Sequence, residues 1–272
     1  MRMKNNDTDE FFVGYLPNMP AHTAKLIRKA TLGMIALAAL LALAFSLAQP
    51  TFYPSVFEFG NTRKFQGVIA AEPYPQLQLL RPALGENNVM VSRYYLVAPF
   101  KYGADQMIAP FVGQAVELEG TLIYRDNQTM IEIVKNGIRK LNAADSANVQ
   151  SYADLQQLAA VKSGQLESLG ELTFRGEIVD SKCYFGVMNP GQGKLHRDCA
   201  VRCISGGIPP VLMVRDQAGS AAYLMLVDRN GAQVNRQVLP LVADYVQITG
   251  EVLRKDNLLI LKADPNTIQR IR

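Results

Sequence analysis

The sequence has few of the side chains from which metal and acid–base sites are usually built, with two histidines and three cysteines among 272 residues. A C-x-x-C-H motif is absent, which excludes a covalently attached c-type haem, and so is a C-x-H pair of the Rieske kind. The sequence also lacks C-x-x-C, G-x-S-x-G, P-loop and H-E-x-x-H motifs. These absences argue against the redox, hydrolase and nucleotide-binding families that the motifs define.

Charge is sparse as well. Charged residues make up 19% of the chain, the net charge is +4, and the basic residues are scattered. A nucleic-acid-binding domain usually carries a basic patch or stripe. We therefore expect no nucleic-acid partner.

One long apolar run predicts a membrane anchor. Thr31 to Ala48 carries no charge, and as a helix it would span roughly the ~30 Å of a hydrocarbon core. Lys25, Arg28 and Lys29 precede the run, whereas the next basic residue after it is Arg63. The positive-inside rule then predicts a cytoplasmic N-terminus and places the bulk of the chain on the outer, periplasmic side of the cell (inner) membrane.

A cleavable signal peptide is the alternative, because Ser46-Leu47-Ala48 offers a small-x-small cleavage site. The segment before the run is long for a signal peptide, so we favour an uncleaved anchor. Within that segment, Asp7 to Met19 sets aromatic residues beside acidic ones. This part of the tail is either a docking element for the membrane surface or a partner subunit, or a disordered tail with incidental aromatics.

After Arg63 the sequence alternates between apolar and polar residues, which is typical of β-strands. Pro-rich loops separate the strands. The clearest predicted strands are 65–69, 94–97, 116–122 and 130–134.

The same pattern returns near the C-terminus. Residues 110–133 align without a gap on residues 240–263, so that Gly120 matches Gly250 and Asp126 matches Asp256. Upstream, the F-x-G-x-I pattern at 65–69 recurs at 174–178. The repeat predicts an internal duplication with the same strand order in both copies.

Each copy has short strands and a glycine inside a strand, as small closed barrels require. The repeated pattern resembles the OB-fold, and the resemblance implies a mainly β protein with two duplicated OB-like barrels behind one N-terminal transmembrane helix. A resemblance at this level implies a fold and no particular activity. The predicted order is a cytoplasmic tail (1–30), a transmembrane helix (31–49), a juxtamembrane linker (50–60), barrel 1 (61–141), a linker helix (142–169) and barrel 2 (170–272).

The linker is expected to hold one helix that packs on a barrel. Ser151 to Asp154 has the sequence of a capping box, and apolar residues follow at helical spacing up to Gly164.

A cysteine insertion distinguishes the second copy. Ile69 and Tyr95 are 26 positions apart in the first copy, whereas Ile178 and Tyr223 are 45 apart in the second. The additional residues of the second copy include Cys183, His196, Cys199 and Cys203, and the first copy has no cysteine or histidine. Gly206-Gly207 should end a helix over 195–205, in which His196, Cys199 and Cys203 share one face.

Three interpretations of these residues stay open. The leading one is a structural disulfide between Cys183 and either Cys199 or Cys203, because an exported domain meets an oxidising compartment. The second is a metal site that draws on all four residues, whose C-x12-H-x2-C-x3-C spacing offers the four ligands of a structural zinc. Positions i and i+7 are ~10.5 Å apart along a regular helix, which argues against His196 and Cys203 sharing one ion. The third is a reactive Cys199 thiol beside His196.

The cofactor is left open among zinc, copper and iron, with Met188 as a further ligand for copper(I). Asp180 and Asp198 flank the cysteines, and each could either orient His196 or act in capping and solvation, which is the favoured role for both. No residue is assigned to catalysis, and binding is favoured over enzymatic activity. The expected function is a membrane-anchored binding or accessory protein that works with a partner protein in a membrane complex, with a redox complex as one candidate. The alternative is a thiol- or metal-dependent redox protein that acts on an exported partner.

Overall fold

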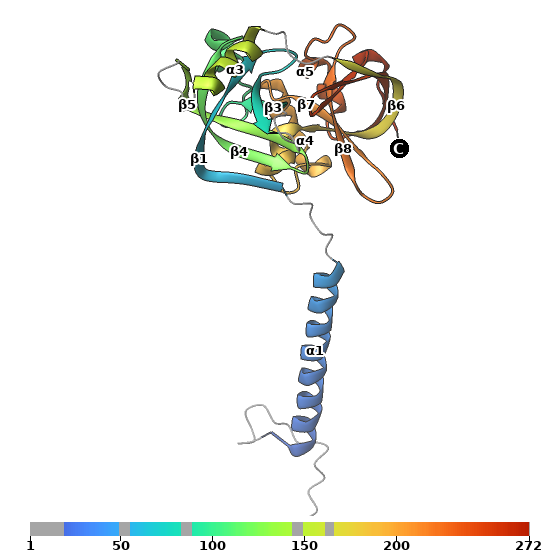
Figure 1. Ribbon diagram of the computed structural model, residues 1–272. Helices are drawn as coiled ribbons and strands as arrows, with labels where there is room; N and C mark the ends of the chain where they lie inside the picture. Colours follow the sequence, from blue (N-terminus) through green and yellow to red (C-terminus); the bar gives the residue numbers. More distant parts are fainter. Residues whose placement is uncertain (1–18, 49–54, 83–88, 143–148, 161–165, 272) are drawn as a thin grey trace, which may run out of the picture. The chain divides into compact units, whose positions relative to one another are not determined.

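The computed structural model describes residues 19–48, 55–82, 89–142, 149–160 and 166–271 (Figure 1). The chain divides into two compact units, Met1–Phe52 and Tyr53–Arg272, and each is described by itself. Most of the acidic and aromatic segment 7–19 lies outside the described residues.

The first unit contains helix α1, Ala21–Ala48. Its most apolar 18-residue window has a mean hydropathy of 2.3, so the helix is long and apolar enough to cross a membrane. The helix begins at Ala21 rather than at Thr31, because nothing between Pro20 and Thr31 breaks it. Its first turns therefore carry Lys25, Arg28 and Lys29.

The second unit begins with a closed barrel of five strands in the order β1-β2-β3-β5-β4. β3 and β5 are parallel, and all other neighbours are antiparallel. The predicted strands are confirmed, and each is longer than its pattern indicated. The elements are β1 Ser55–Ala70, β2 Gln76–Pro82, β3 Val89–Val97, α2 Asp105–Ile108, the 3-10 turn η1 Ala109–Phe111, β4 Ala115–Arg125 and β5 Gln128–Lys140.

β1 starts inside segment 50–60, which the sequence predicted to be a linker. Its first three residues, 55–57, pair with residues 123–125 of β4. The register then shifts between Phe57 and Thr62, where Gly60 has a φ of +85°. A glycine with positive φ allows the strand to bend there, so β1 reaches β4 on both sides of the irregularity.

The second barrel has the order β10-β8-β7-β6-β9 and is closed by the pairing of β10 with β9, and β11 is added at β9. Again one neighbouring pair, β8 and β10, is parallel. The elements are β6 Glu167–Asp180, β7 Pro210–Arg215, β8 Ala221–Val227, α5 Asn235–Val238, η5 Leu239–Leu241, β9 Tyr245–Lys255, β10 Leu258–Lys262, η6 Pro265–Thr267 and β11 Gln269–Arg270.

The two barrels repeat each other, as the sequence predicted. The α2–η1 pair before β4 corresponds to the α5–η5 pair before β9. A Cβ on Gly120 would lie 2.7 Å from the carbonyl oxygen of Glu132, and a Cβ on Gly250 would lie 2.3 Å from that of Lys262. Both hairpins therefore need glycine at the same point, where two strands cross too closely for a side chain.

Helix α3, Val149–Ala160, packs on the first barrel, as predicted for the linker. Leu155 and Leu158 are buried there. They belong to a cluster with the barrel residues Val68, Ala115 and Leu141. The predicted capping box does not start the helix, because Val149 precedes Ser151 and no proline or glycine separates the two.

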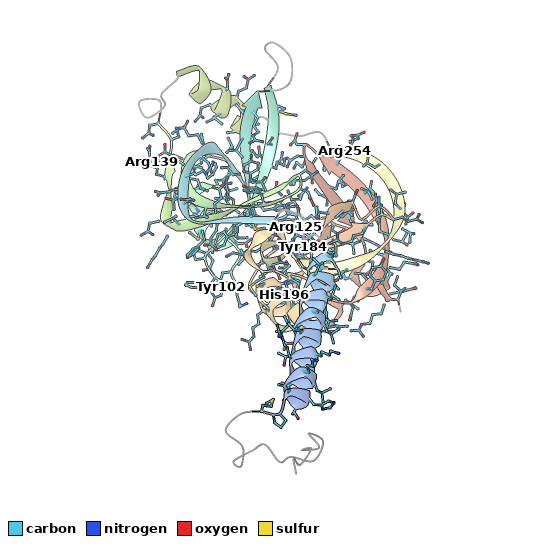
Figure 2. All side chains as sticks on the ribbon, turned by 90° about the horizontal axis from the view of Figure 1, so that it is seen from below. Tyr102, Arg125, Arg139, Tyr184, His196 and Arg254 are labelled. Atoms are coloured by element: carbon cyan, nitrogen blue, oxygen red, sulfur yellow. The ribbon has the colours of Figure 1, made fainter. Side chains whose placement is uncertain are left out.

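One hydrophobic cluster joins the barrels. It combines side chains of β3, β4 and β5 with side chains of β6, β7, β8 and the cysteine insertion; among them are Tyr95, Ile123, Met130, Cys183, Phe185 and Tyr223. At its edge the guanidinium of Arg125 lies 4.2 Å from the ring centre of Tyr184 (Figure 2). The insertion is therefore part of the contact between the barrels.

Candidate functional site

The cysteine insertion occupies residues 181–209, between β6 and β7. The corresponding connection in the first barrel, between β1 and β2, is only 71–75. The insertion contains the π-helical turn η3 Cys183–Val187, the 3-10 turn η4 Lys194–His196 and helix α4 Arg197–Ser205.

The predicted helix over 195–205 is confirmed with a later start. Lys194–His196 forms a tighter 3-10 turn, which places His196 directly before α4. The helix ends where expected, because Gly207 adopts a φ of +101°, a conformation that favours glycine.

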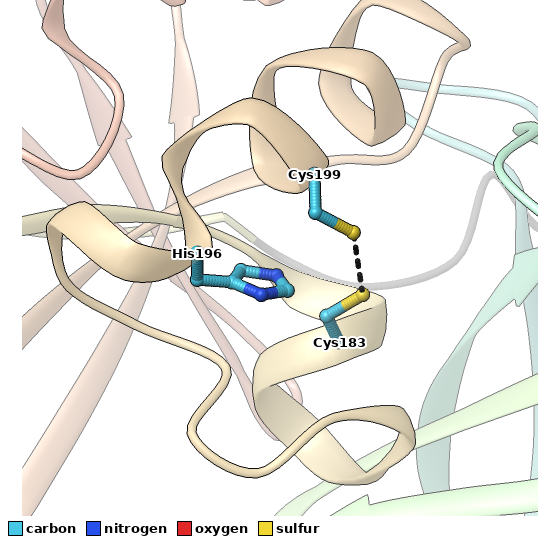
Figure 3. A group of neighbouring side chains, drawn as sticks. All are labelled: Cys183, His196 and Cys199. Atoms are coloured by element: carbon cyan, nitrogen blue, oxygen red, sulfur yellow. Dashed lines mark hydrogen bonds between the residues drawn. The ribbon is translucent and has the colours of Figure 1, made fainter.

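Cys183 lies at the centre of the three cysteines. Its Sγ is 4.0 Å from the Sγ of Cys199 (Figure 3). It is also 4.0 Å from the Sγ of Cys203. All three are free thiols, so the predicted disulfide is not formed in this structure. A disulfide would hold two sulfurs about 2.05 Å apart. Two thiolates on one tetrahedral metal, each bonded at ~2.3 Å, are about 3.8 Å apart, which is close to the observed separation.

His196 and Asp180 form a buried pair. The imidazole Nε2 lies 3.0 Å from Asp180 Oδ2, and the two side chains are 4% and 0% exposed. The other carboxylate oxygen accepts the backbone N–H of Cys183 at 2.8 Å. The sequence offered two roles for Asp180, orienting His196 or capping and solvation, and the contact with His196 agrees with the less favoured of the two.

The possible ligand atoms fall into two overlapping groups within 4.8 Å. One group is Cys183, His196 and Cys199, and the other is Asp180, Cys183 and Cys203. Cys183 belongs to both. His196 and Cys203 are in different groups, in accordance with their expected separation along the helix. The imidazole points toward the sulfurs of Cys183 and Cys199 (Figure 3).

Lys101, from the first barrel, is a site residue that sequence reasoning missed. Its Nζ donates to Cys199 Sγ at 2.7 Å and lies 3.8 Å from Cys203 Sγ. The hydrogen bond to Cys199 raises the pKa of the Lys101 ammonium, against the opposing effect of partial burial. A positive charge thus stands at two of the three sulfurs.

Cys183 and Cys203 share a hydrogen bond between their sulfurs. The hydrogen bond to Cys203 and burial raise the pKa of the Cys183 thiol. The hydrogen bond between the two sulfurs lowers the pKa of the Cys203 thiol, and the nearby Lys101 ammonium acts in the same direction. Both effects stabilise the thiolate form of Cys203.

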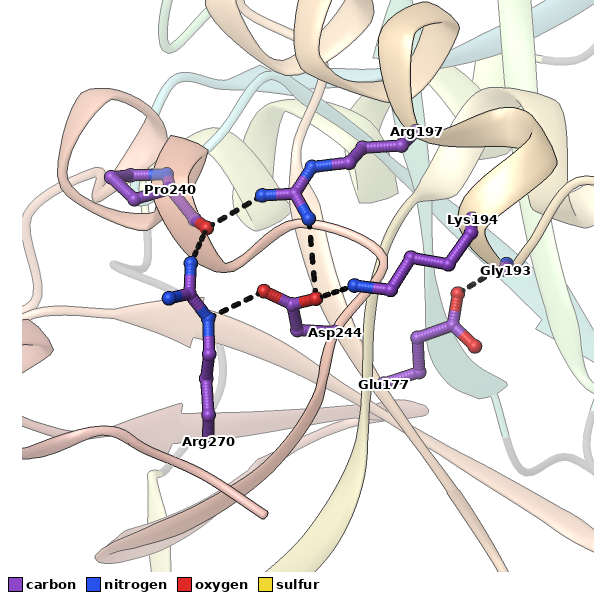
Figure 4. A network of polar contacts seen from close by, with 7 residues as sticks. All are labelled: Glu177, Gly193, Lys194, Arg197, Pro240, Asp244 and Arg270. Carbon is purple, nitrogen blue, oxygen red and sulfur yellow. Dashed lines mark hydrogen bonds and ion pairs between the residues drawn. The ribbon is translucent and has the colours of Figure 1, made fainter. Parts of the chain in front are cut away.

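A separate ionic cluster fixes the start of α4 to the second barrel (Figure 4). Asp244, with its side chain 7% exposed, pairs with Lys194, with Arg197 at 3.2 Å and with Arg270 at 2.6 Å. Burial alone would raise the pKa of Asp244, but hydrogen bonds from Lys194 and Arg270 outweigh it and lower the pKa. Two of these cations flank His196 in the sequence, so the cluster limits where the imidazole can lie.

A cleft of about 600 Å³ adjoins the backbone of the Lys101 loop. It is lined by residues 98–100, 102–103, 105–107 and 135–136 of the first barrel and by Gly206 at the end of α4. Phe100 and Tyr102, which are 83% and 61% exposed, stand on its rim. This surface lies beside the cysteines without containing them.

The chain matches no protein-family model and no curated protein. The structure combines two five-stranded barrels, a thiol–imidazole cluster where the barrels meet, and an apolar N-terminal helix.

The cysteines and histidine that the sequence singled out do come together. Met188 keeps its side chain 45% exposed, and Asp198 is exposed on α4. Asp180 was visible in the sequence as one of the two aspartates that flank the cysteines. Lys101 carried no signal, because it lies 98 positions before Cys199 in a copy that has no cysteine or histidine.

Proposed function

We propose that the protein is a single-pass membrane-anchored accessory protein whose second barrel binds a thiophilic metal ion. Cys183, His196 and Cys199 would supply the ligands, with Cys203 next to Cys183. The metal belongs to the class that thiolate and imidazole prefer, which includes zinc, copper(I) and iron. The observation that carries this proposal is the 4.0 Å spacing of the sulfurs beside a buried imidazole.

The hydrogen bond between His196 and Asp180 supports the same proposal. Histidines that bind a metal through one ring nitrogen usually donate the other N–H to a carboxylate or carbonyl. With Nε2 bonded to Asp180, Nδ1 is the nitrogen that remains for a metal. The buried carboxylate would also increase the basicity of the ligand.

The anchor and the barrels complete the proposal. Helix α1 would cross the inner membrane with Lys25, Arg28 and Lys29 on the cytoplasmic side, which leaves the barrels in the periplasm. The barrels would be OB-folds, since a closed five-stranded barrel with the order β1-β2-β3-β5-β4 agrees with that resemblance. An anchored binding protein of this kind would work with a partner protein of a membrane complex and not with nucleic acid.

Thiol exchange is the second candidate function. Cys183 is within 4.0 Å of two other sulfurs, and Cys199 is the one cysteine that is only partly buried. Cys199 would attack a disulfide of an exported protein, and Cys183 would then displace that protein. Two thiols of this chain would become a disulfide while the partner's disulfide becomes two thiols.

Elemental analysis of the full chain, purified in detergent without chelator, tests the proposal. We expect about one bound metal ion per chain and no thiol that reacts with an alkylating agent until chelator is added. Cys183→Ser, His196→Ala and Cys199→Ser should each lower the metal content. Asp198→Asn, on the exposed side of α4, is the matched control and should leave it unchanged.

Two outcomes would contradict metal binding. A metal-free protein with two thiols lost as a disulfide would favour thiol exchange. A metal-free protein with three reactive thiols would also contradict metal binding, and it would agree with the reduced form of a thiol-exchange protein.

A further inference from the structure

Lys101 belongs to the loop that connects β3 to α2 in the first barrel, yet its side chain ends at the cysteines of the second. The ammonium group lies 2.7 Å from the Cys199 sulfur and 3.8 Å from the Cys203 sulfur. A cation from the first barrel thus lies at two sulfurs of the second.

The backbone of this loop is held in place from the second barrel. Lys182, whose side chain is 2% exposed, donates to the carbonyl oxygens of Ala98 at 2.8 Å and Phe100 at 2.7 Å. Lys182 also pairs with Glu132 of β5. A buried ammonium with these three partners is satisfied, and it fixes the chain directly before Lys101.

The far side of the loop is fixed as well. The Gly103 N–H donates to the carbonyl oxygen of Gly206 at 2.9 Å. A Cβ on Gly206 would lie 2.0 Å from the carbonyl oxygen of Lys101, so the loop and the end of α4 are in direct backbone contact. The backbone of Lys101 cannot withdraw without breaking these contacts, and only its side chain can leave the sulfurs.

A metal ion and an ammonium group compete for the same sulfur. Metal binding through Cys199 needs an electron pair of its sulfur, and in this structure that sulfur accepts a hydrogen bond from the Lys101 ammonium. Two positive charges at one sulfur also repel each other. We infer that Lys101 is the cation that the metal displaces: it holds the Cys199 sulfur in the metal-free protein and swings away when the ion binds. This inference rests on the proposed metal binding, and it makes the first barrel part of the site.

The reactivity of the Lys101 amine reports its position. The full chain in detergent is treated with a brief pulse of acetic anhydride, with and without saturating Zn²⁺, and acetylation is quantified by peptide mass spectrometry. Zn²⁺ should increase the rate at Lys101 about tenfold, as expected when an amine loses one hydrogen bond to a charged group. Lys135 lines the cleft beside the loop and is exposed, so its rate should not change and serves as the internal control.

Cys199→Ala provides the second arm. Without the sulfur, Lys101 should be acetylated quickly even in the absence of Zn²⁺, and Zn²⁺ should not increase the acetylation rate further. If the wild-type thiols become protected by Zn²⁺ while the rate at Lys101 stays the same, the inference is wrong and metal binding stands. If Zn²⁺ protects no thiol, both the inference and the proposed function fail.

Discussion

At the scale of single residues, the buried pair of Asp180 and His196 determines what the cysteines can do. The Asp180 carboxylate can accept a hydrogen bond from a proton carried on Nε2, and a neutral imidazole in that tautomer has its lone pair on Nδ1. The carboxylate also accepts the backbone N–H of Cys183, which fixes the first cysteine relative to the imidazole. One carboxylate thus positions two of the proposed ligands.

Asp180→Asn should weaken metal binding by about 10- to 100-fold, the usual effect of losing a carboxylate that supports a histidine ligand. The amide group has nearly the same shape, so the site should stay folded while the basicity and orientation of His196 change. Competition with a coloured chelator measures the affinity. Asp198→Asn is the control, and equal affinity in the two variants would show that Asp180 does not support the ligand.

At the scale of elements, one β-hairpin turn of each barrel contacts the other barrel. Asp126, in the turn between β4 and β5, accepts a hydrogen bond from Tyr223 of β8. Asp256, in the turn between β9 and β10, pairs with Arg93 of β3 at 2.6 Å. Both aspartates have positive φ, 52° and 54°, which Asp tolerates better than most residues. The duplicated turns thus make reciprocal contacts, and these help to hold the barrels together beneath the site.

Arg93→Met should destabilise the two-barrel unit by about 3 kcal/mol, because it removes one partner of a buried ion pair. The Arg93 side chain is fully buried and Asp256 is 19% exposed. Arg254→Met is the matched control, since its ion pair with Glu167 is exposed on both sides and should contribute less than about 1 kcal/mol. Urea denaturation of the full chain in detergent, followed by circular dichroism, compares the two. Equal urea midpoints for the two variants would contradict a stabilising role of the buried ion pair between Arg93 and Asp256.

At the scale of the whole molecule, an apolar helix and a two-barrel unit occupy different parts of the chain. Positive charge is unevenly distributed around the apolar run of α1. Three basic residues lie in the first turns of the helix, whereas the next basic residue after the run is Arg63 in β1. Cysteines in the periplasm would meet an oxidising environment, where a bound metal would keep three free thiols from pairing.

The charge asymmetry gives a prediction about orientation. A reporter enzyme that is active only outside the cytoplasm should be active when fused after Arg272. The positive-inside rule predicts that the basic end of α1 stays in the cytoplasm, so the other end of the helix leads to the outer side. Replacing Lys25, Arg28 and Lys29 by Ala should reduce that activity. Activity confined to a cytoplasmic reporter at the same position would place the barrels on the other side of the membrane.

The sequence by itself determined the features whose causes are local. The apolar run predicted α1, alternation predicted the strands, and the spacing of glycines and turn residues predicted two barrels with one strand order. Cys183, His196, Cys199 and Cys203 stood out because they are rare and lie in one insertion. Strand ends were less predictable, since the pairing of residues 55–57 with β4 extends β1 beyond its pattern.

Only the tertiary structure decided which groups meet at the site. A disulfide, a metal site and a reactive thiol all agree with the same spacing, and the choice depends on distances between sulfurs that no spacing records. Lys101 and Lys182 reach across from one barrel to the other over 98 and 84 positions of sequence. Contacts of that range follow from how the two barrels pack, because the pattern around each lysine is that of an ordinary loop or strand end.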